Sequence, residues 1–260
     1  MRRLSSAFRG GSGSGGGVSV LGISGLEVSY GHLQVLFGID LEVAEGEVVA
    51  LLGTNGAGKS TLLRAVMGMI PVGAGTVRFD GTDITGAGPE GAVARGLIRM
   101  EGGRAMFPSL TVEENLRLGG YPDLRRSPGD VRARVEASLE VFPALRSLRD
   151  RRAGTLSGGE QQMVAVGRAL VAQPKLLMID ELSLGLAPVV LQQLVEVVRR
   201  LAERGVSVLL VEQSLNVALS VAHRAYYLEK GEVRFSGDPA VLTERGDLVR
   251  SVFFGAGAAS

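Results

Sequence analysis

The stretch Gly53-Thr54-Asn55-Gly56-Ala57-Gly58-Lys59-Ser60-Thr61 decides the fold. It matches the pattern G-x-x-x-x-G-K-[ST] of a phosphate-binding loop, whose glycines let backbone N–H groups turn inward around phosphate oxygens. The residues before it, EVVALLG, predict a buried strand, and the residues after it, KSTLLRAVMGMI, predict an amphipathic helix that Pro71 and Gly73 end. A strand, this loop and a helix in this order are typical of an α/β fold that binds a nucleotide.

Each residue type in the loop has a chemical role in holding a nucleotide. The Lys59 ammonium is expected to reach the β- and γ-phosphates, and the Ser60 hydroxyl is expected to be a ligand of Mg²⁺. The helix that starts near Gly58 adds its positive amino-terminal end. The residues predicted to bind the nucleotide through this loop are Gly53, Asn55, Gly56, Ala57, Gly58, Lys59, Ser60 and Thr61.

Two acidic residues follow a second apolar run, in Leu176-Leu177-Met178-Ile179-Asp180-Glu181. Four successive apolar residues predict a strand that is buried on both faces, as in a parallel sheet. At its carboxyl end Asp180 would hold Mg²⁺ through water, and Glu181 would polarise an attacking water as general base. Because many strands end in acids, this pattern becomes specific only together with the phosphate-binding loop.

The composition excludes several other classes of protein. A length of 260 residues suffices for one large domain or two small ones, and 45% apolar with 21% charged residues is ordinary for a soluble globular protein. The absence of cysteine excludes a disulfide scaffold and a thiol nucleophile, and a formal net charge of +1 does not indicate nucleic acid as a partner. No apolar run reaches the roughly 18–20 residues of a membrane span.

The chain divides into a tail and one folded unit. Residues 1–17 are rich in glycine and serine and are predicted to be a disordered tail. In residues 18–260, the first part predicts antiparallel strands, and about residues 103–172 predict an inserted helical part. The remainder alternates between strands and helices, which indicates a parallel sheet with crossover helices.

A third motif, Leu156-Ser157-Gly158-Gly159-Glu160-Gln161-Gln162, lies between the loop and the acidic pair. Ser157, Gly158 and Gly159 stand at a helix start, where a hydroxyl and open backbone can bind an anion. Ser157 and Glu160 also fit an ordinary capping box, and the two interpretations are compatible. With the three motifs in this order, the sequence resembles the ATP-binding cassette (ABC) family, whose signature is LSGGQ.

The resemblance to ABC proteins implies a fold, cofactors and site residues. The expected fold is an α/β P-loop nucleoside triphosphatase of ABC type, with a mainly parallel sheet core, an antiparallel β subdomain and a helical subdomain. The expected cofactors are ATP and Mg²⁺. Ser157, Gly158 and Gly159 are expected to meet the γ-phosphate of ATP held by another subunit. Gln213 takes the place of the family's switch histidine and can still hydrogen-bond the γ-phosphate.

Other positions implied by the resemblance leave alternatives open. Tyr30 lies where the family places an aromatic ring that stacks on adenine, and the alternative is a buried core tyrosine. The family has glutamine or glutamate nine residues before Thr111, in a loop that contacts the metal and the membrane subunit, but this position is Gly102. Either Glu101 serves as metal ligand instead, or that contact is weakened. His223 is expected to be a helix-end residue and not a substitute for the switch histidine.

Three segments resemble one subtype of the family. TVEENL (111–116), SLGLAP (183–188) and Val211-Glu212-Gln213 are most similar to the shorter ATPase subunit of branched-chain amino-acid importers. This implies an ATP-hydrolysing subunit that powers import of branched-chain amino acids or a related small polar solute. The implied partners are a second ABC ATPase subunit, identical or related, and transmembrane permease subunits, with no nucleic acid. The implied location is cytoplasmic, on the inner face of the cell membrane.

Two other functions remain open at this stage. One is a non-transport ABC ATPase, and the other is a slow regulatory subunit that binds ATP. Intact Lys59, Asp180 and Glu181 favour turnover, while Gly102 and Gln213 depart from the usual family pattern.

Overall fold

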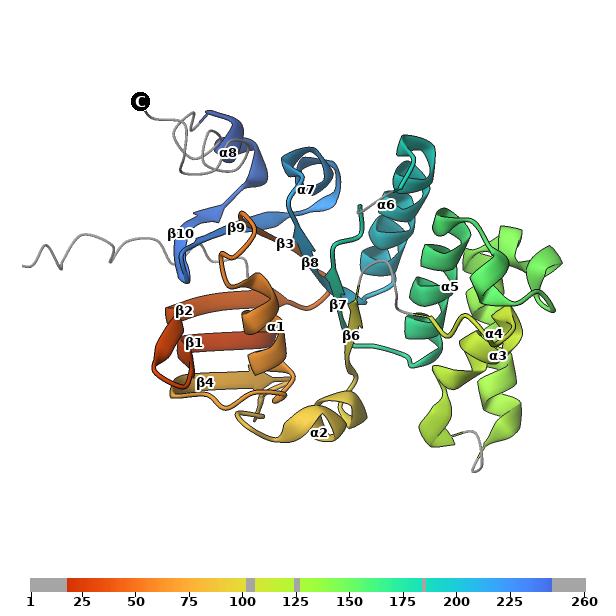
Figure 1. The fold of residues 1–260 in the computed structure, drawn as a ribbon, viewed down its shortest axis with the longest axis horizontal. Coiled ribbons are helices and arrows are strands. Elements are labelled where there is room, and N and C mark those ends of the chain that lie inside the picture. Colours follow the sequence, from red (N-terminus) through yellow and green to blue (C-terminus); the bar gives the residue numbers. More distant parts are fainter. Residues whose placement is uncertain (1–17, 102–105, 124–126, 184–185, 245–260) are drawn as a thin grey trace, which may run out of the picture.

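The structure is a computed structural model that describes residues 18–101, 106–123, 127–183 and 186–244. Two sheets lie at its centre, and a group of helices stands to one side (Figure 1). The predicted tail at 1–17, Gly102, and residues 184–185 of the SLGLAP segment lie outside the described residues.

Within the described residues, the large sheet has six strands, five of which run parallel. They are β3 (Val48–Leu52), β6 (Leu97–Glu101), β7 (Leu176–Asp180), β8 (Ser207–Glu212), β9 (Arg224–Glu229) and β10 (Glu232–Gly237). Their order across the sheet is β10-β9-β3-β8-β7-β6, with β10 antiparallel to β9. This order confirms the predicted parallel core, in which the strand that precedes the phosphate-binding loop is central.

The smaller sheet is antiparallel and is built from the first part of the chain. Its strands in the described residues are β1 (Ser19–Tyr30), β2 (Leu33–Ala44), β4 (Ala74–Phe79) and β5 (Thr82–Asp83), in the order β2-β1-β4-β5. The predicted antiparallel β subdomain is confirmed. β1 and β2 are each 12 residues long, and their pairing contains register shifts.

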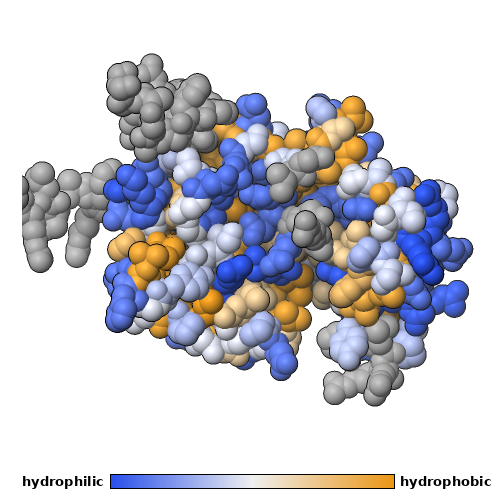
Figure 2. All heavy atoms as spheres, in the orientation of Figure 1, coloured by the Kyte–Doolittle hydropathy of each residue, from blue (hydrophilic) through white to orange (hydrophobic). Residues whose placement is uncertain are grey.

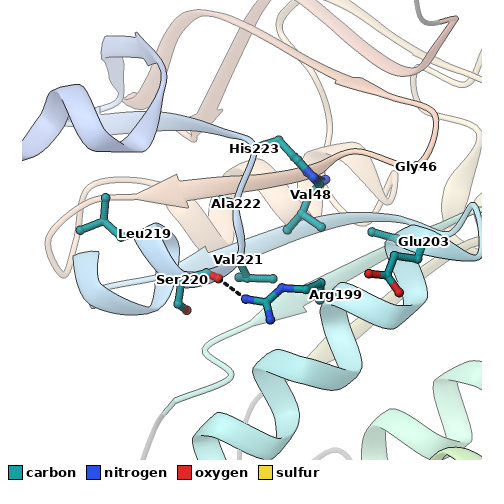
Figure 3. Close-up of a pocket in the computed structure, with 10 residues that line it drawn as sticks. Gly46, Val48, Arg199, Glu203, Leu219, Ser220, Val221, Ala222 and His223 are labelled. Carbon is teal, nitrogen blue, oxygen red and sulfur yellow. Dashed lines mark hydrogen bonds between the residues drawn. The ribbon is translucent and has the colours of Figure 1, made fainter.

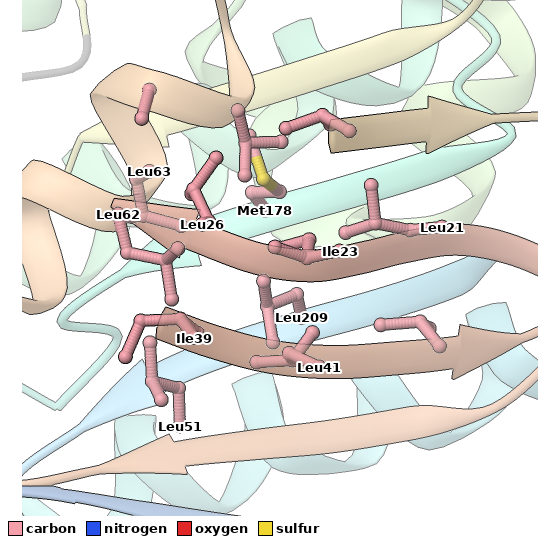
Figure 4. Packing of buried hydrophobic residues seen from close by; sticks show 14 of the residues in the cluster. Leu21, Ile23, Leu26, Ile39, Leu41, Leu51, Leu62, Leu63, Met178 and Leu209 are labelled. Atoms are coloured by element: carbon pink, nitrogen blue, oxygen red, sulfur yellow. The ribbon is translucent and has the colours of Figure 1, made fainter. Parts of the chain in front are cut away.

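The inner strands β3, β7, β8 and β9 of the large sheet are buried on both faces, because their side chains alternate between two apolar layers. In β7, Leu176 and Met178 pack in the layer that also contains the antiparallel sheet. Leu177 and Ile179 pack in the opposite layer. Figure 4 shows Met178 in the first layer, with leucines and isoleucines of β1, β2, α1 and β8 around it.

Helices cover both sheets and form the separate group. They are α1 (Lys59–Val66), α2 (Gly88–Ala94), α3 (Val112–Leu118), α4 (Pro128–Val141), α5 (Gly158–Val171), α6 (Pro188–Glu203), α7 (Leu215–Val221) and α8 (Pro239–Glu244). Short 3₁₀ helices lie at Tyr121–Asp123, Pro143–Leu148 and Ala153–Thr155. α3, α4 and α5 pack together beyond β6 (Figure 1). Their position fits the predicted helical part.

The end of α1 differs from the prediction. The sequence predicts that Pro71 and Gly73 end this helix, but it ends at Val66. Gly68 has a φ of +66°, and its N–H donates to the Ala65 carbonyl at 2.9 Å. The following N–H donates to the carbonyl five residues back, also at 2.9 Å. These bonds form the Schellman arrangement, in which a left-handed glycine ends a helix before any proline is reached.

No helix among the described residues is both long enough and apolar enough to span a membrane. On the face drawn in Figure 2, apolar surface occurs in separate patches divided by polar side chains.

Gly68→Ala is expected to lower the free energy of unfolding. The left-handed backbone alone costs about 1–2 kcal/mol for a residue with a Cβ, and that Cβ would lie 2.6 Å from the Gly88 nitrogen. Gly81→Ala is the matched control, because Gly81 has a φ of +73° with nothing within 4 Å of an added Cβ. Urea unfolding measures both variants, and equal losses would contradict the steric contribution at Gly68.

Candidate nucleotide site

The phosphate-binding loop connects β3 to α1 at the carboxyl edge of the large sheet. A Cβ added to Gly53 would lie 2.4 Å from the Leu228 carbonyl oxygen on β9. Gly58 has a φ of +107°, which residues with a Cβ rarely adopt. The N-cap residue of α1 is Gly58, which has no side chain to cap the amino end of the helix. Its first N–H groups and its helix dipole therefore point to an anion as the natural ligand.

The other predicted residues of the loop divide by exposure. Asn55, Gly56 and Ser60 are exposed, and Thr61 is half-buried. Ala57 is buried, and its carbonyl accepts a hydrogen bond from the Gly231 N–H at 2.9 Å. Ala57 therefore fixes the loop against the turn between β9 and β10.

The Lys59 side chain turns back into the loop. Its Nζ donates to the carbonyl oxygens of Gly53 and Thr54 at 2.7 and 2.9 Å. Burial lowers the pKa of Lys59, while three nearby carboxylates act in the opposite direction. They belong to Glu181, Asp180 and Glu212. The loop thus holds a cation close to the acidic end of the neighbouring strands.

Asp180, the last residue of β7, pairs with an arginine that sequence reasoning missed. Arg99 Nη2 lies 3.0 Å from Asp180 Oδ2, and Arg99 Nη1 lies 3.2 Å from Glu101 Oε1. Glu101, a predicted metal ligand, therefore lies near Asp180 but is paired with Arg99, and its metal role stays a prediction. The sequence feature that could have revealed this pair is the arginine inside the apolar run LIRM, because a buried guanidinium needs an acidic partner.

Glu181 and Gln213 meet although 31 residues separate them in the chain (182–212). Gln213 Nε2 donates to Glu181 Oε1 at 2.5 Å. Glu181 has a φ of +61°, a conformation that is sparsely populated for residues other than glycine and is concentrated at functional sites. Its N–H donates to the Val211 carbonyl at 2.9 Å. This bond to β8 holds Glu181 where Gln213 can reach it.

A second bridge joins the same two segments. Glu212 is 1% exposed, and it accepts hydrogen bonds from the Ser183 N–H at 2.9 Å and the Ser183 hydroxyl at 2.7 Å. Burial raises the pKa of Glu212, and the hydrogen bonds from Ser183 oppose that effect. The sequence analysis names Glu212 only as part of the motif Val211-Glu212-Gln213. That a buried acid lies here could have been predicted, because Glu212 ends the apolar run SVLLVE.

Ser157 is the N-cap of α5, a helix of the helical group. Ser157 and Glu160 form the predicted capping box, with the Ser157 N–H donating to Glu160 Oε2 at 2.8 Å. Ser157 and Gly158 are exposed. Figure 1 shows α5 on the far side of β6 and β7 from α1. The structure therefore does not bring Ser157, Gly158 and Gly159 together with the phosphate-binding loop of the same chain.

Tyr30 and His223 lie outside this cluster. Tyr30 ends β1 and is 43% exposed, so the alternative of a buried core tyrosine is wrong. His223 Nδ1 accepts a hydrogen bond from the Val48 N–H at 2.9 Å. Val48 begins β3, so His223 lies at the amino edge of the sheet, opposite the loop. Figure 3 shows His223 beside Val48. Both line a cavity of about 420 Å³ together with Arg199 and Ser220, and this position confirms that His223 does not substitute for Gln213.

The family follows from a comparison with known proteins. A family model described as ABC transporter matches residues 36–183, which is more than half of the chain. The chain belongs to the ABC transporter family. As an ABC ATPase it binds and hydrolyses ATP, and the predicted family and enzyme class are confirmed.

Two relatives of this ABC ATPase carry the subtype that the motifs predict. It is 43% identical over 226 residues to the high-affinity branched-chain amino acid transport ATP-binding protein BraG of Pseudomonas aeruginosa, covering 87% of this chain and 95% of that protein. It is 36% identical over 220 residues to a probable branched-chain amino acid transport ATP-binding protein, LivF, of Archaeoglobus fulgidus, covering 84% and 92%.

Solved structures show the same fold. The ABC ATPase is similar to an ATP-binding cassette of an ABC transporter in its ADP conformation, with a TM-score of 0.83, 27% identity and coverage of 92% and 99%. It is also similar to a dimeric cassette in a post-hydrolysis state bound to ADP and Pi, with a TM-score of 0.72, 26% identity and coverage of 84% and 98%.

Glu212→Gln is expected to change how stability depends on pH. Because burial raises the pKa of Glu212 in the fold, the folded state binds the proton more tightly than the unfolded chain. Stability from this group is therefore greatest below the unfolded pKa of about 4.3 and falls as pH rises toward the higher folded value. The variant lacks this loss, so its melting temperature relative to wild type should rise with pH.

The measurement is a series of thermal melts from acidic to neutral pH. Glu203→Gln, an exposed change on α6, is the control and should run parallel to wild type. Parallel curves for Glu212→Gln as well would contradict the raised pKa.

Proposed function

We propose that this ABC ATPase powers an importer of branched-chain amino acids or a related small polar solute. The names of the relatives BraG and LivF support the substrate class. The observation that carries the catalytic part is the contact between Gln213 and Glu181 at 2.5 Å, beside a loop that contains Lys59. This contact supports the roles of Glu181 as candidate base and of Gln213 as hydrogen-bond donor toward the γ-phosphate.

In the proposed mechanism, the chain works by positioning and charge. The N–H groups at the start of α1 and the Lys59 ammonium hold the phosphates of ATP. Glu181 accepts the proton of the attacking water, and Gln213 orients Glu181 and donates to the γ-phosphate. The Ser60 hydroxyl and the Asp180 carboxylate are hard oxygen donors that fit Mg²⁺, which also takes phosphate and water ligands. When bound, Mg²⁺ would neutralise charge that develops on the phosphates.

We further propose that a second ABC ATPase subunit completes the site. Ser157 and Gly158 are exposed at the start of α5 and cannot serve the loop of their own chain in this arrangement. They would meet the γ-phosphate of ATP bound by the partner subunit, identical or related. The exposed Tyr30 ring would stack on the adenine of the ATP that its own chain binds.

Permease subunits are proposed to dock beside β6, which would place the protein on the cytoplasmic inner face of the membrane. A cavity of about 390 Å³ there is lined by Met69, Phe107, Arg99 and Glu101, among others. Met69 is 52% and Phe107 50% exposed, so apolar surface is available to a partner beside the charged side chains of this cavity. Apolar side chains with charges beside them suit an amphipathic helix as partner.

Glu181→Gln is expected to lower steady-state ATP hydrolysis by about 100-fold or more, because a general base contributes about 10²–10⁴ to rate. The amide keeps the shape but cannot accept the proton. ATP binding, measured with a fluorescent analogue, should persist. In cells that depend on this chain for import, the same variant should abolish uptake of labelled leucine.

The outcomes separate the competing functions. Equal hydrolysis by wild type and Glu181→Gln would contradict the catalytic assignment and favour the slow regulatory subunit. If the purified protein hydrolyses ATP normally but cells that lack it take up leucine as before, the proposed substrate class is contradicted. Purification from membranes that recovers ribosomes or DNA-repair factors and no permease would favour a non-transport ABC ATPase.

Gly158→Ala tests the proposed second subunit. Among the described residues, a Cβ on Gly158 meets nothing within 4 Å, whereas one on Gly159 would lie 2.6 Å from Val190 Cγ1. Gly158→Ala should therefore not lower the melting temperature, yet it should lower ATP-dependent dimer formation and hydrolysis about tenfold or more. Analytical ultracentrifugation with ATP in the Glu181→Gln background measures the dimer. Undiminished dimer and hydrolysis would contradict the role of Gly158 across the subunits.

A further inference from the structure

A buried guanidinium spans two acids at the edge of the nucleotide site. Arg99 is the middle residue of β6, the strand next to β7. Its Nη2 lies 3.0 Å from Asp180 Oδ2, while its Nη1 lies 3.2 Å from Glu101 Oε1. Because different nitrogens of one planar group meet different carboxylates, the directions of both contacts are set together.

Burying the ion pair of Arg99 and Asp180 costs free energy. The Arg99 side chain is 7% exposed and that of Asp180 is 14% exposed. Arg99 Nε is buried and has no hydrogen-bond partner among the residues that the structure describes. Taking charges out of water costs free energy that mutual attraction offsets only in good geometry. The neighbouring positions Leu97, Ile98 and Met100 are apolar, so the contact with Asp180 accounts for a charged residue here.

Arg99 engages only one of the two oxygens of Asp180. Across the described part of the chain, Asp180 Oδ1 forms no side-chain hydrogen bond or ion pair. We propose that Arg99 is a positioning residue, which holds Asp180 by Oδ2 and thereby keeps Oδ1 directed to the metal side of the site. The inference rests on the proposed function, because it takes from there the role of Asp180 toward Mg²⁺.

Arg99 could act as a positioning residue or as a simple positive charge, and the two roles predict opposite changes in metal affinity when Arg99 is replaced. As a mere positive charge, Arg99 would repel a metal ion, so its removal would tighten metal binding. As a positioning residue, it must contact both acids through its fork. Lysine keeps the charge but has a single compact ammonium, so Arg99→Lys should still release Asp180. Second-shell partners that orient metal ligands typically contribute about 10–100-fold in metal affinity.

The test measures Mn²⁺ binding to the full chain loaded with ADP, by the electron paramagnetic resonance signal of free Mn²⁺. Mn²⁺ prefers the same oxygen ligands as Mg²⁺, and ADP leaves no hydrolysis to complicate the result. Arg99→Lys and Arg99→Met should each weaken Mn²⁺ binding, on the order of tenfold. Arg95→Met, an exposed change four residues earlier, should bind Mn²⁺ like wild type. Thermal melts check folding, and Arg99→Lys carries the test if Arg99→Met fails to fold.

Asp180→Asn distinguishes a failure of the positioning role of Arg99 from a failure of the metal role of Asp180. If Asp180→Asn weakens Mn²⁺ binding while Arg99→Lys binds as wild type or more tightly, the positioning role of Arg99 is overturned and the proposed function stands. If Asp180→Asn itself leaves Mn²⁺ binding unchanged, the metal role of Asp180 fails, and the inference fails with it.

Discussion

The register of three parallel strands is the constraint on which the site depends. Leu52 of β3 lies opposite Glu212 of β8, and Val211 of β8 lies opposite Asp180 of β7. Because the three strands end at one edge, the residues that follow them emerge side by side. A slip of one residue would turn each alternating side chain to the other face of the sheet. The two apolar layers, which accept Met178 on one face and Ile179 on the other, forbid that slip.

This shared edge concentrates negative charge. Asp180, Glu181 and Glu212 all act on Lys59, and each has a further partner that limits its freedom. Gln213 holds Glu181, and Ser183 holds Glu212. These hydrogen bonds matter because unpaired carboxylates in a partly buried edge would repel one another and favour protonation. The same bonds tie the segment after β7 to the segment after β8, so that neither can move without disturbing the other.

The parts of the site that were predictable from sequence are those whose signal is local. The loop at 53–61 and the acids after LLMI each follow from a few adjacent residues, and both lie where the pattern places them. Arg99 was missed because its partner Asp180 is 81 residues away and β6 has only a short apolar run. The end of α1 was misplaced for another reason: Gly68 and Pro71 are both stop signals, and only backbone geometry shows that the glycine acts first.

Contacts within the chain explain one of two adjacent glycines but not the other. Gly159 is explained within the chain, because a Cβ would overlap Val190 on α6. Gly158 is not, because its surroundings have room for a Cβ and its φ needs no glycine. Alanine would also favour the first turn of a helix by comparison with glycine. We propose that Gly158 is required instead by a group that approaches from outside the chain, because an exposed helix start beside a hydroxyl suits a phosphate carried by another subunit.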